Sequence, residues 1–266
     1  MEILYDRSQK RLLCFKNIED TFWDQTWAKR DIKTTFRNVS RFNIVNRTTK
    51  KYLNPEDGPI LEGGCGLGQY VYSLNEAGYE CSGIDIAEKT VAKIKDTYPH
   101  LKIDVMDVRK LDYPDNFFAG YWSLGVIEHF YEGYDTIVCE MFRVLKENGY
   151  LFMTVPVMSP LRKFKARLGL YPEWNNQDKS SSNFYQFTFN SKDIIFNLKR
   201  RGFKLIETRP YDGIKGLKDE VMILKRYLQY IYDSQHFSIK LLKKTLDILL
   251  KHFANHMRLF VMQKVS

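Results

Sequence analysis

The chain has 266 residues, of which 44% are hydrophobic and 27% charged, so it is long enough to form one large globular domain with a full core. Its net charge is +9, from 41 Lys and Arg against 32 Asp and Glu. This excess fits nucleic acid, an anionic lipid or an acidic substrate, but no zinc-finger or RNA-binding fingerprint accompanies it. A solvated, lysine-rich surface is the simpler explanation.

The four cysteines, Cys14, Cys65, Cys81 and Cys139, are far apart and form no CxxC pair. They indicate a reduced chain with neither a disulfide framework nor a metal site. The first ten residues lack the apolar core of a signal peptide, and no apolar run reaches the ~20 residues of a membrane span. We therefore expect a cytoplasmic protein without a metal.

Residues 1–57 are polar and predict a helical N-terminal segment that packs on the core, with Phe22, Trp23 and Trp27 spaced to share one helix face. From Gly58 onward, predicted strands alternate with predicted helices. The strands lie at 59–64, 79–86, 101–107, 117–124 and 150–156, and the helices at 69–78, 87–99 and 134–149. This order predicts an α/β fold, a parallel sheet with helices on both faces.

After Pro156 the alternation lapses. A basic stretch at 161–169 and a serine-rich segment at 175–183 come first. The sequence then predicts a helix at 191–202, a strand at 203–211, two helices within 216–254 and a strand at 256–265. We place one domain at 58–266. Its insertions at 157–190 and 211–255 are expected to cap the carboxyl edge of the sheet and to carry acceptor specificity, because binding loops vary on a fixed scaffold.

The stretch PILEGGCGLGQYVYSL places a glycine-rich turn between a buried strand and a helix. Glycines allow positive φ and close approach to a ligand, and the following helix directs free N–H groups at it. A dinucleotide site would have a third glycine at Gln69. The spacing is instead E-x-G-x-G-x-G, formed by Glu62, Gly64, Gly66 and Gly68, which sets a carboxylate below the loop, where it could meet an ammonium group.

Acidic residues also end the next two strands. Asp85 could accept both hydroxyls of a ribose, and Asp107 with the N–H of Val108 could contact an adenine. A helix cap at Asp85 and a local turn at Asp107 are the structural alternatives. Together with Glu62 they predict three acids on one edge of a parallel sheet, where α/β sheets bind ligands.

The region from Pro59 to Pro156 resembles the class I S-adenosylmethionine-dependent methyltransferases, closest to the small-molecule group with a type 11-like domain. The matching motifs are ILEGGCGLG and LGVIEHF…RVLKENGYLFMTVP. The resemblance implies a Rossmann-like, seven-stranded, mostly parallel sheet whose last strand is antiparallel. The cofactor would be S-adenosylmethionine, converted to S-adenosylhomocysteine, without a metal. Asn148, where the family has Pro or Gly, and the long insertion before the last strand depart from the pattern.

The resemblance also implies roles for single residues. Glu62 and Gly64 would serve the methionine moiety, Asp85 the ribose, and Asp107 with Val108 the adenine. The complete cofactor-binding set is Glu62, Gly64, Cys65, Gly66, Gly68, Asp85, Ile86, Asp107, Val108, Ser123 and Leu124. Ser123, Leu124 and His129 would line the wall that faces the transferred methyl.

A catalytic base is needed only if the acceptor loses a proton, because methyl transfer depends mainly on positioning. The candidates are His129 and Tyr185, with Glu128 as a more structural residue. His129 could instead hydrogen-bond a loop, and Tyr185 could be core.

The insertions at 157–190 and 211–255, rather than a sequence motif, would determine the acceptor. We expect a small molecule; a nucleic-acid or protein methyltransferase and a non-catalytic cofactor-binding module remain as alternatives. An amino-directed DNA enzyme would carry [DN]PP[YF], where this chain has SLGV. Anionic partners could be contacted through Arg162, Lys163, Lys165 and Arg167. Membrane contact by the amphipathic stretch 238–253 is not favoured, since Leu242, Leu246, Leu249 and Phe253 are expected to pack on the domain.

Overall fold

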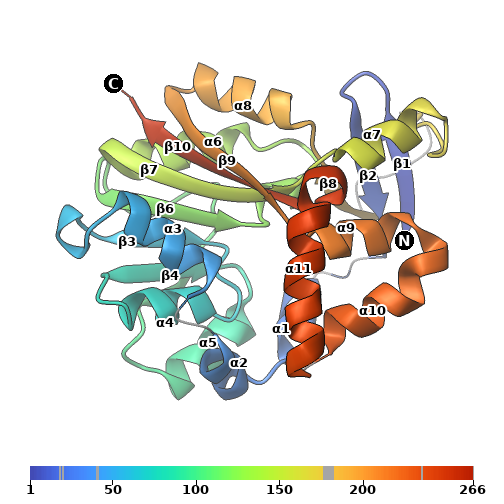
Figure 1. The fold of residues 1–266 in the computed structure, drawn as a ribbon. Coiled ribbons are helices and arrows are strands. Elements are labelled where there is room, and N and C mark those ends of the chain that lie inside the picture. The colour runs from blue at the N-terminus through green and yellow to red at the C-terminus, as the bar shows by residue number, and fades with distance from the viewer. Residues whose placement is uncertain (18, 20, 40–41, 176–182, 235, 266) are drawn as a thin grey trace.

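The computed structural model describes residues 1–17, 19, 21–39, 42–175, 183–234 and 236–265, so most of the serine-rich segment at 175–183 lies outside the described residues. Its centre is a seven-stranded sheet with the order β5-β4-β3-β6-β7-β10-β9 (Figure 1). The strands are β3 (Ile60–Gly63), β4 (Cys81–Asp85), β5 (Ile103–Val105), β6 (Phe118–Leu124), β7 (Leu145–Pro156), β9 (Phe203–Tyr211) and β10 (Met257–Lys264).

Strand directions place the chemistry at one edge of the sheet. Neighbours among β3, β4, β5, β6 and β7 pair in parallel, and β10 pairs antiparallel with both β7 and β9, which confirms the predicted fold class. Leu124 is opposite Thr154, and Met257 is opposite both Pro156 and Tyr211. The ends of β6, β7 and β9 and the start of β10 therefore meet at one carboxyl edge.

Helices cover both faces of this sheet (Figure 1). One face carries α3 (Ile44–Tyr52), α4 (Gln69–Asn75) and α5 (Glu88–Thr97), with α2 (Ile32–Asn38) packed outside α4. The other face carries α6 (Asp135–Val144) and α8 (Ser191–Arg200). The apolar sides of these helices are buried in two core clusters, one on each face of the sheet. Trp122 and Phe152 belong to one cluster, and Tyr121 and Met153 belong to the other. The sheet is therefore apolar on both faces.

The carboxyl edge is surrounded by elements from distant parts of the chain (Figure 1). They are α1 (Phe22–Ala28), α7 (Pro160–Arg167), α9 (Gly213–Glu220), α10 (Lys225–Asp233), α11 (Phe237–Ala254), and a small sheet of β1 (Glu2–Asp6), β2 (Arg11–Phe15) and β8 (Phe184–Thr188) in the order β1-β2-β8. Helix α9 meets α11 backbone to backbone, since a Cβ on Gly216 would lie 1.6 Å from the Ala254 carbonyl oxygen.

Three predictions about single elements are wrong. The N-terminal segment is helical only from Phe22, and its first fifteen residues form the β1–β2 hairpin, whose partner β8 lies some 170 residues later in the sequence. Such long-range pairing leaves no local signal. The two helices predicted at 216–254 are three, α9 to α11, because the first ends at Glu220 and the second at Asp233. The helix predicted at 134–149 ends at Val144, where β7 begins.

The stripe on α11 also differs from expectation. Leu242, Leu249 and Phe253 are 46%, 68% and 50% exposed, so they do not pack on the domain as predicted. The side of α11 that contacts the protein is instead occupied by Ala254 and by the approach to Gly213 and Gly216. None of the helices in the described ranges is both long enough and apolar enough to cross a bilayer.

Candidate active site

The glycine loop after β3 has the backbone that only glycine adopts easily. Gly64, Gly66 and Gly68 have φ of 73°, 54° and 73°, in the left-handed region. A Cβ on Gly64 would lie 2.6 Å from Val126, and one on Gly66 would lie 2.7 Å from the Trp27 ring. The loop is therefore held closely between β6 and α1, and Gly68 begins α4.

Asp85 ties this loop to the neighbouring strand. It ends β4, and its Oδ2 accepts a hydrogen bond from Gly66 N at 2.7 Å while Oδ1 accepts one from Ala87 N at 2.9 Å. Burial raises the pKa of the Asp85 carboxyl, although these two N–H donors oppose the shift. Each oxygen keeps a further lone pair for a ligand hydroxyl.

A cavity of about 680 Å³ runs from this loop along the carboxyl edge to α9 and α10. Its volume falls within the ~300–1,000 Å³ that is usual for small-molecule sites. Nine of the residues predicted for the site line it: Glu62, Gly64, Cys65, Gly66, Asp85, Ile86, Val108, Leu124 and His129. The sequence thus located one end of the cavity well.

Four predicted residues do not line the cavity. Gly68 lies behind the loop, Ser123 is fully buried with no described partner for its hydroxyl, and Tyr185 packs behind His129. Asp107 is bound by Arg109, with Oδ2 accepting from Nη2 at 2.6 Å. Burial alone would raise the pKa of Asp107, but hydrogen bonds from Arg109 hold it below its ordinary value.

Buried polar atoms without a protein partner gather at the loop end of the cavity. Among the described residues none satisfies Trp27 Nε1, Glu62 Oε2 or Gln69 Oε1, and all three side chains line the cavity. Burial raises the pKa of Glu62 well above its ordinary value. A buried polar group that lacks a partner is costly, so this trio of one donor and two acceptors has the character of a binding site.

His129 has a defined tautomer. Its Nδ1 lies 2.7 Å from the Tyr185 carbonyl oxygen, which can only accept, so Nδ1 carries the proton and Nε2 keeps its lone pair. Burial lowers the pKa of His129 to about 4. The ring is therefore neutral near pH 7, and its low basicity makes it a weak proton acceptor. Glu128 is buried just below Gly125, and burial raises its pKa to about 8.

The rest of the cavity is formed by residues that the sequence analysis did not assign to the site. Trp27 of α1 lies over Gly66 at the loop end, with Arg30 near its ring. The far end is formed by Trp23 of α1, the last residue of β9, the first residue of β10 and residues between these strands: Tyr211, Met257, Asp212, Lys215, Tyr232 and His256. Asp212 has the left-handed φ of 57°, unusual for a residue other than glycine. The only sequence signal was the D-G pair after a predicted strand, which marks a turn rather than a site.

Two of the four cations predicted for the basic stretch of α7 are used internally. Arg162 is 4% exposed, and its Nε donates to Glu220 Oε1 at 2.8 Å, while Lys165 donates to Glu220 Oε2 at 2.6 Å. These two are therefore not available to an outside anion, contrary to the prediction, whereas Lys163 and Arg167 are exposed.

Comparison with known proteins agrees with this geometry. A family model described as "Methyltransferase domain" matches residues 61–153. A curated relative from Mycolicibacterium smegmatis, named "Probable S-adenosylmethionine-dependent methyltransferase", is 26% identical over 149 residues, which are 56% of this chain and 53% of the relative. The chain thus spans about half the length of that relative.

Solved structures share the fold at low identity. A SAM-dependent methyltransferase from Methanosarcina mazei has a TM-score of 0.56 and 16% identity, covering 82% of this chain and 97% of that one. The 4+2 cyclase SpnF has a TM-score of 0.55 and 15% identity, covering 95% and 99%. Haemonchus contortus phosphoethanolamine N-methyltransferase 2 was solved with phosphomonomethylethanolamine and S-adenosylhomocysteine. It has a TM-score of 0.51 and 18% identity, and the match covers 85% of this chain and 53% of that one.

The strand order, the glycine loop and the family match coincide on one stretch of sequence. Residues 61–153 contain the strands β3 to β7, except the first residue of β3 and the last three residues of β7, together with the glycine loop and Asp85. Residues 61–153 therefore match a methyltransferase domain in sequence, and the sheet that they build has the fold of solved S-adenosylmethionine-dependent methyltransferases.

Proposed function

We propose that this chain binds S-adenosylmethionine and transfers its methyl group to a small-molecule acceptor held at the α9 end of the cavity. The observation that carries the proposal is the set of unpartnered buried atoms beside the glycine loop. Glu62 Oε2 and Gln69 Oε1 are acceptors that suit the ammonium group of a methionine moiety. Trp27 Nε1 is a donor that suits its carboxylate, and Arg30 lines the cavity close by, with its guanidinium 5.9 Å from the Trp27 ring.

The remaining cofactor contacts follow the sheet. Asp85 has lone pairs for the ribose hydroxyls, and Ile86, Met106 and Val108 form an apolar surface for the adenine. Because Asp107 is already bound by Arg109, we assign adenine contact to Val108 and its neighbours more than to the Asp107 carboxylate. When bound, the cofactor supplies an electrophilic methyl group on a sulfonium sulfur.

The protein's contribution is to position the acceptor and to exclude water. Trp23, Tyr211 and Tyr232 line the acceptor end with aromatic surface, and α1, α9 and α10 supply them from outside the central sheet. Ordering both reactants can supply ~7–11 kcal/mol of the barrier. A cavity bounded in this way favours a compact acceptor over an extended polymer, and the Haemonchus contortus methyltransferase of similar fold was solved with a small substrate.

Two experiments test the proposal. Isothermal titration should show binding of S-adenosylmethionine and S-adenosylhomocysteine, and none of NAD; the reverse result would refute the cofactor assignment. Incubation of a metabolite extract with methyl-labelled cofactor, followed by mass spectrometry, should give a labelled small molecule. A protein that binds the cofactor but labels no acceptor would instead be a non-catalytic module, a concern since the same fold occurs in a 4+2 cyclase.

The polymer alternative has its own test. Anisotropy titration with mixed DNA and RNA should show weak binding at low salt and none at physiological salt. Such binding would be non-specific, and its affinity would fall steeply with salt because the cations of the protein neutralise several phosphates. Tight binding at physiological salt would overturn the small-molecule acceptor and leave the methyltransferase domain in place.

A further inference from the structure

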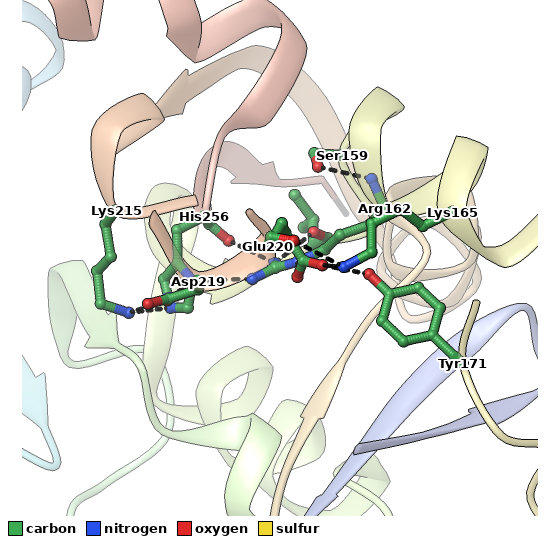
Figure 2. A network of polar contacts seen from close by, with 9 residues as sticks. Ser159, Arg162, Lys165, Tyr171, Lys215, Asp219, Glu220 and His256 are labelled. Atoms are coloured by element: carbon green, nitrogen blue, oxygen red, sulfur yellow. Dashed lines mark hydrogen bonds and ion pairs between the residues drawn. The ribbon is translucent and has the colours of Figure 1, made fainter. Parts of the chain in front are cut away.

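A buried polar network joins α7 to the acceptor end of the cavity (Figure 2). Glu220 accepts from Arg162, Lys165 and Tyr171, which fixes the Arg162 guanidinium. Arg162 Nη1 also donates to the Val157 carbonyl oxygen at 3.0 Å. The network ends at His256 and Lys215, both of which line the cavity.

The hydrogen bonds at His256 determine the protonation of Lys215. Two groups face His256 Nδ1: Arg162 Nη2 at 3.1 Å, which can only donate, and Asp219 Oδ2 at 3.5 Å, which can only accept. Because the guanidinium is the closer of the two and within hydrogen-bond distance, we assign Nδ1 as the acceptor. The neutral imidazole then carries its proton on Nε2. Nε2 lies 2.5 Å from Lys215 Nζ, so the Nε2–H can only donate to a lone pair on Lys215. A lysine that accepts a hydrogen bond is a neutral amine.

The charges around Lys215 act in both directions. Burial lowers the pKa of Lys215, and Arg162 and Lys218 lower it further, while Asp219 and Asp212 oppose the shift. Asp219 Oδ2 is 3.5 Å from Lys215 Nζ, a longer contact than the one with His256. Two other titratable groups in this region are Glu128 on η2 (Ile127–His129) and Tyr232 on α10. Two more, Lys243 and Asp247 on α11, act on the charge of Asp212.

We propose that Lys215 is held as a neutral amine and is the base that receives the acceptor's proton, an inference that rests on the proposed methyl transfer. The acceptor's lone pair forms a bond to the methyl carbon, the carbon–sulfur bond breaks, and its electron pair stays on sulfur. The proton leaves the acceptor for Lys215 Nζ, which becomes an ammonium paired with Asp219 and Asp212. Lys215 is one turn from the end of β9 and lines the same cavity as Leu124 of β6 and Thr154 of β7, where the methyl is expected.

The proposal restricts the acceptor class. An amine base serves an acceptor that has a proton to lose, such as a hydroxyl or an amine N–H. A thioether or a tertiary amine has none, and it would leave Lys215 without a function in the reaction.

The first test measures protonation without turnover. In protein labelled with [13C]lysine, the Cε resonance of Lys215, assigned by its absence in Lys215→Arg, should titrate at a lower pH than a free lysine side chain does. The assignment control is Lys244→Arg. Titration of Lys215 together with the exposed lysines would overturn the proposal, whether or not the protein binds S-adenosylmethionine.

The second test uses the labelled-methyl assay. Lys215→Arg keeps a cation and Lys215→Met keeps the aliphatic chain, and both should lose roughly 10²–10⁴-fold in turnover while S-adenosylhomocysteine affinity stays within about threefold. Wild-type kcat/KM should rise with pH through the Lys215 titration measured by NMR. Lys199→Met, at an exposed position on α8 that does not line the cavity, is the matched control and should keep wild-type turnover. Full activity of Lys215→Met would refute the base, while absent cofactor binding in wild type would refute the proposed function instead.

A separate observation concerns the outer face of α10 and α11. On α11, Phe237, Leu241 and Ile248 are 84%, 58% and 54% exposed, at spacings that share one side with exposed Leu242 and Leu249. In η4 (Met222–Leu224), Ile223 is 86% exposed, and exposed tyrosines follow on α10. Soluble surfaces rarely expose this many large apolar side chains on helices that pack together, as α10 does on η4 and α11, without a partner.

The charges beside this face indicate the partner. Lys225 and Arg226 on α10 and Lys240 and Lys244 on α11 are exposed along it. We infer that the face docks on an anionic lipid bilayer, with apolar side chains in the acyl boundary and lysines at the headgroups. Since α9 and α10 line the cavity through Lys215 and Tyr232, and α11 packs on both helices, docking would bring a lipophilic acceptor to its mouth.

Vesicle flotation tests this docking. The full chain should float with phosphatidylcholine vesicles that contain phosphatidylglycerol and stay behind with pure phosphatidylcholine. Ile223→Ser with Leu249→Ser should lose flotation at least tenfold, and Lys240→Gln with Lys244→Gln should weaken it, whereas Phe196→Ser, an exposed aromatic on α8, should not. Equal flotation on both vesicles, none on either, or a stable dimer by light scattering that the Ile223 and Leu249 changes abolish would overturn the inference.

Discussion

The two ends of the cavity are built differently. The loop end is formed by Glu62 to Gln69 and Asp85, which lie within a span of 24 residues on adjacent strands. The acceptor end draws on α1, η2, α9, α10 and the residue before β10, spread over more than 230 residues. A site made from neighbouring strands tolerates little change in its backbone, whereas one made from separate helices can be altered piece by piece.

The largest effect is expected where the acceptor end is anchored. Arg162→Met removes the cation from a buried pair and should lower the free energy of unfolding by about 3 kcal/mol, the low end for such a loss, because Lys165 and Tyr171 still bind Glu220. Urea unfolding measures it. Arg201→Met, which breaks the exposed pair with Asp135, is the control and should cost at most about 1 kcal/mol. Equal losses would mean that the network does not anchor this end.

At the loop end, Asp85→Ala should weaken binding of S-adenosylhomocysteine by about 2–4 kcal/mol, roughly 30- to 1000-fold. The change removes the ribose acceptor and frees the N–H groups of Gly66 and Ala87 that shape the loop. Calorimetric titration gives the affinity. Asp104→Ala, on exposed β5 and off the cavity, should bind like wild type, and the ribose assignment fails if Asp85→Ala does too.

Trp27 lies where the loop end of the cavity meets the acceptor end, and Trp27→Phe tests its contribution to cofactor binding. The change keeps a ring over Gly66 but removes the buried Nε1–H, and S-adenosylhomocysteine affinity should fall by about 1–2 kcal/mol. Trp23→Phe keeps the neighbouring ring stack and should alter the affinity less. An unchanged affinity for Trp27→Phe would assign Trp27 to water exclusion alone.

The smallest effect is a pH dependence at the loop end. Burial raises the pKa of free Glu62, so it is protonated at a pH where an ordinary carboxyl is ionised. An ammonium ligand favours the carboxylate form of Glu62, so binding of the ligand releases a proton. The affinity for S-adenosylhomocysteine should therefore rise with pH, by at most about tenfold per pH unit, until the pH passes the pKa of Glu62 in the free protein. Calorimetry in buffers of different ionisation enthalpy measures the released proton. Glu62→Gln should bind more weakly and show no such release.

The same contrast explains what the sequence could predict. The glycine loop and the alternation of strands and helices are local patterns, and they placed the parallel part of the sheet. Together with the family resemblance that these patterns carry, they also named nine residues that line the cavity. Lys215 and His256 carry no local signal, because they become neighbours only when β9 and β10 pair. The hairpin of β1 and β2 was missed for the same reason, since its burial depends on β8.

The position of β10 has a consequence for how the protein is made. Among the described strands β9 pairs only with β10, which comes 45 residues later and inserts between β7 and β9. During synthesis β9 therefore leaves the ribosome before its only neighbour exists, and such non-local pairing is slow. Since His256 immediately precedes β10, the acceptor end should become ordered in the same late step that completes the sheet, after the glycine loop and its strands have already formed.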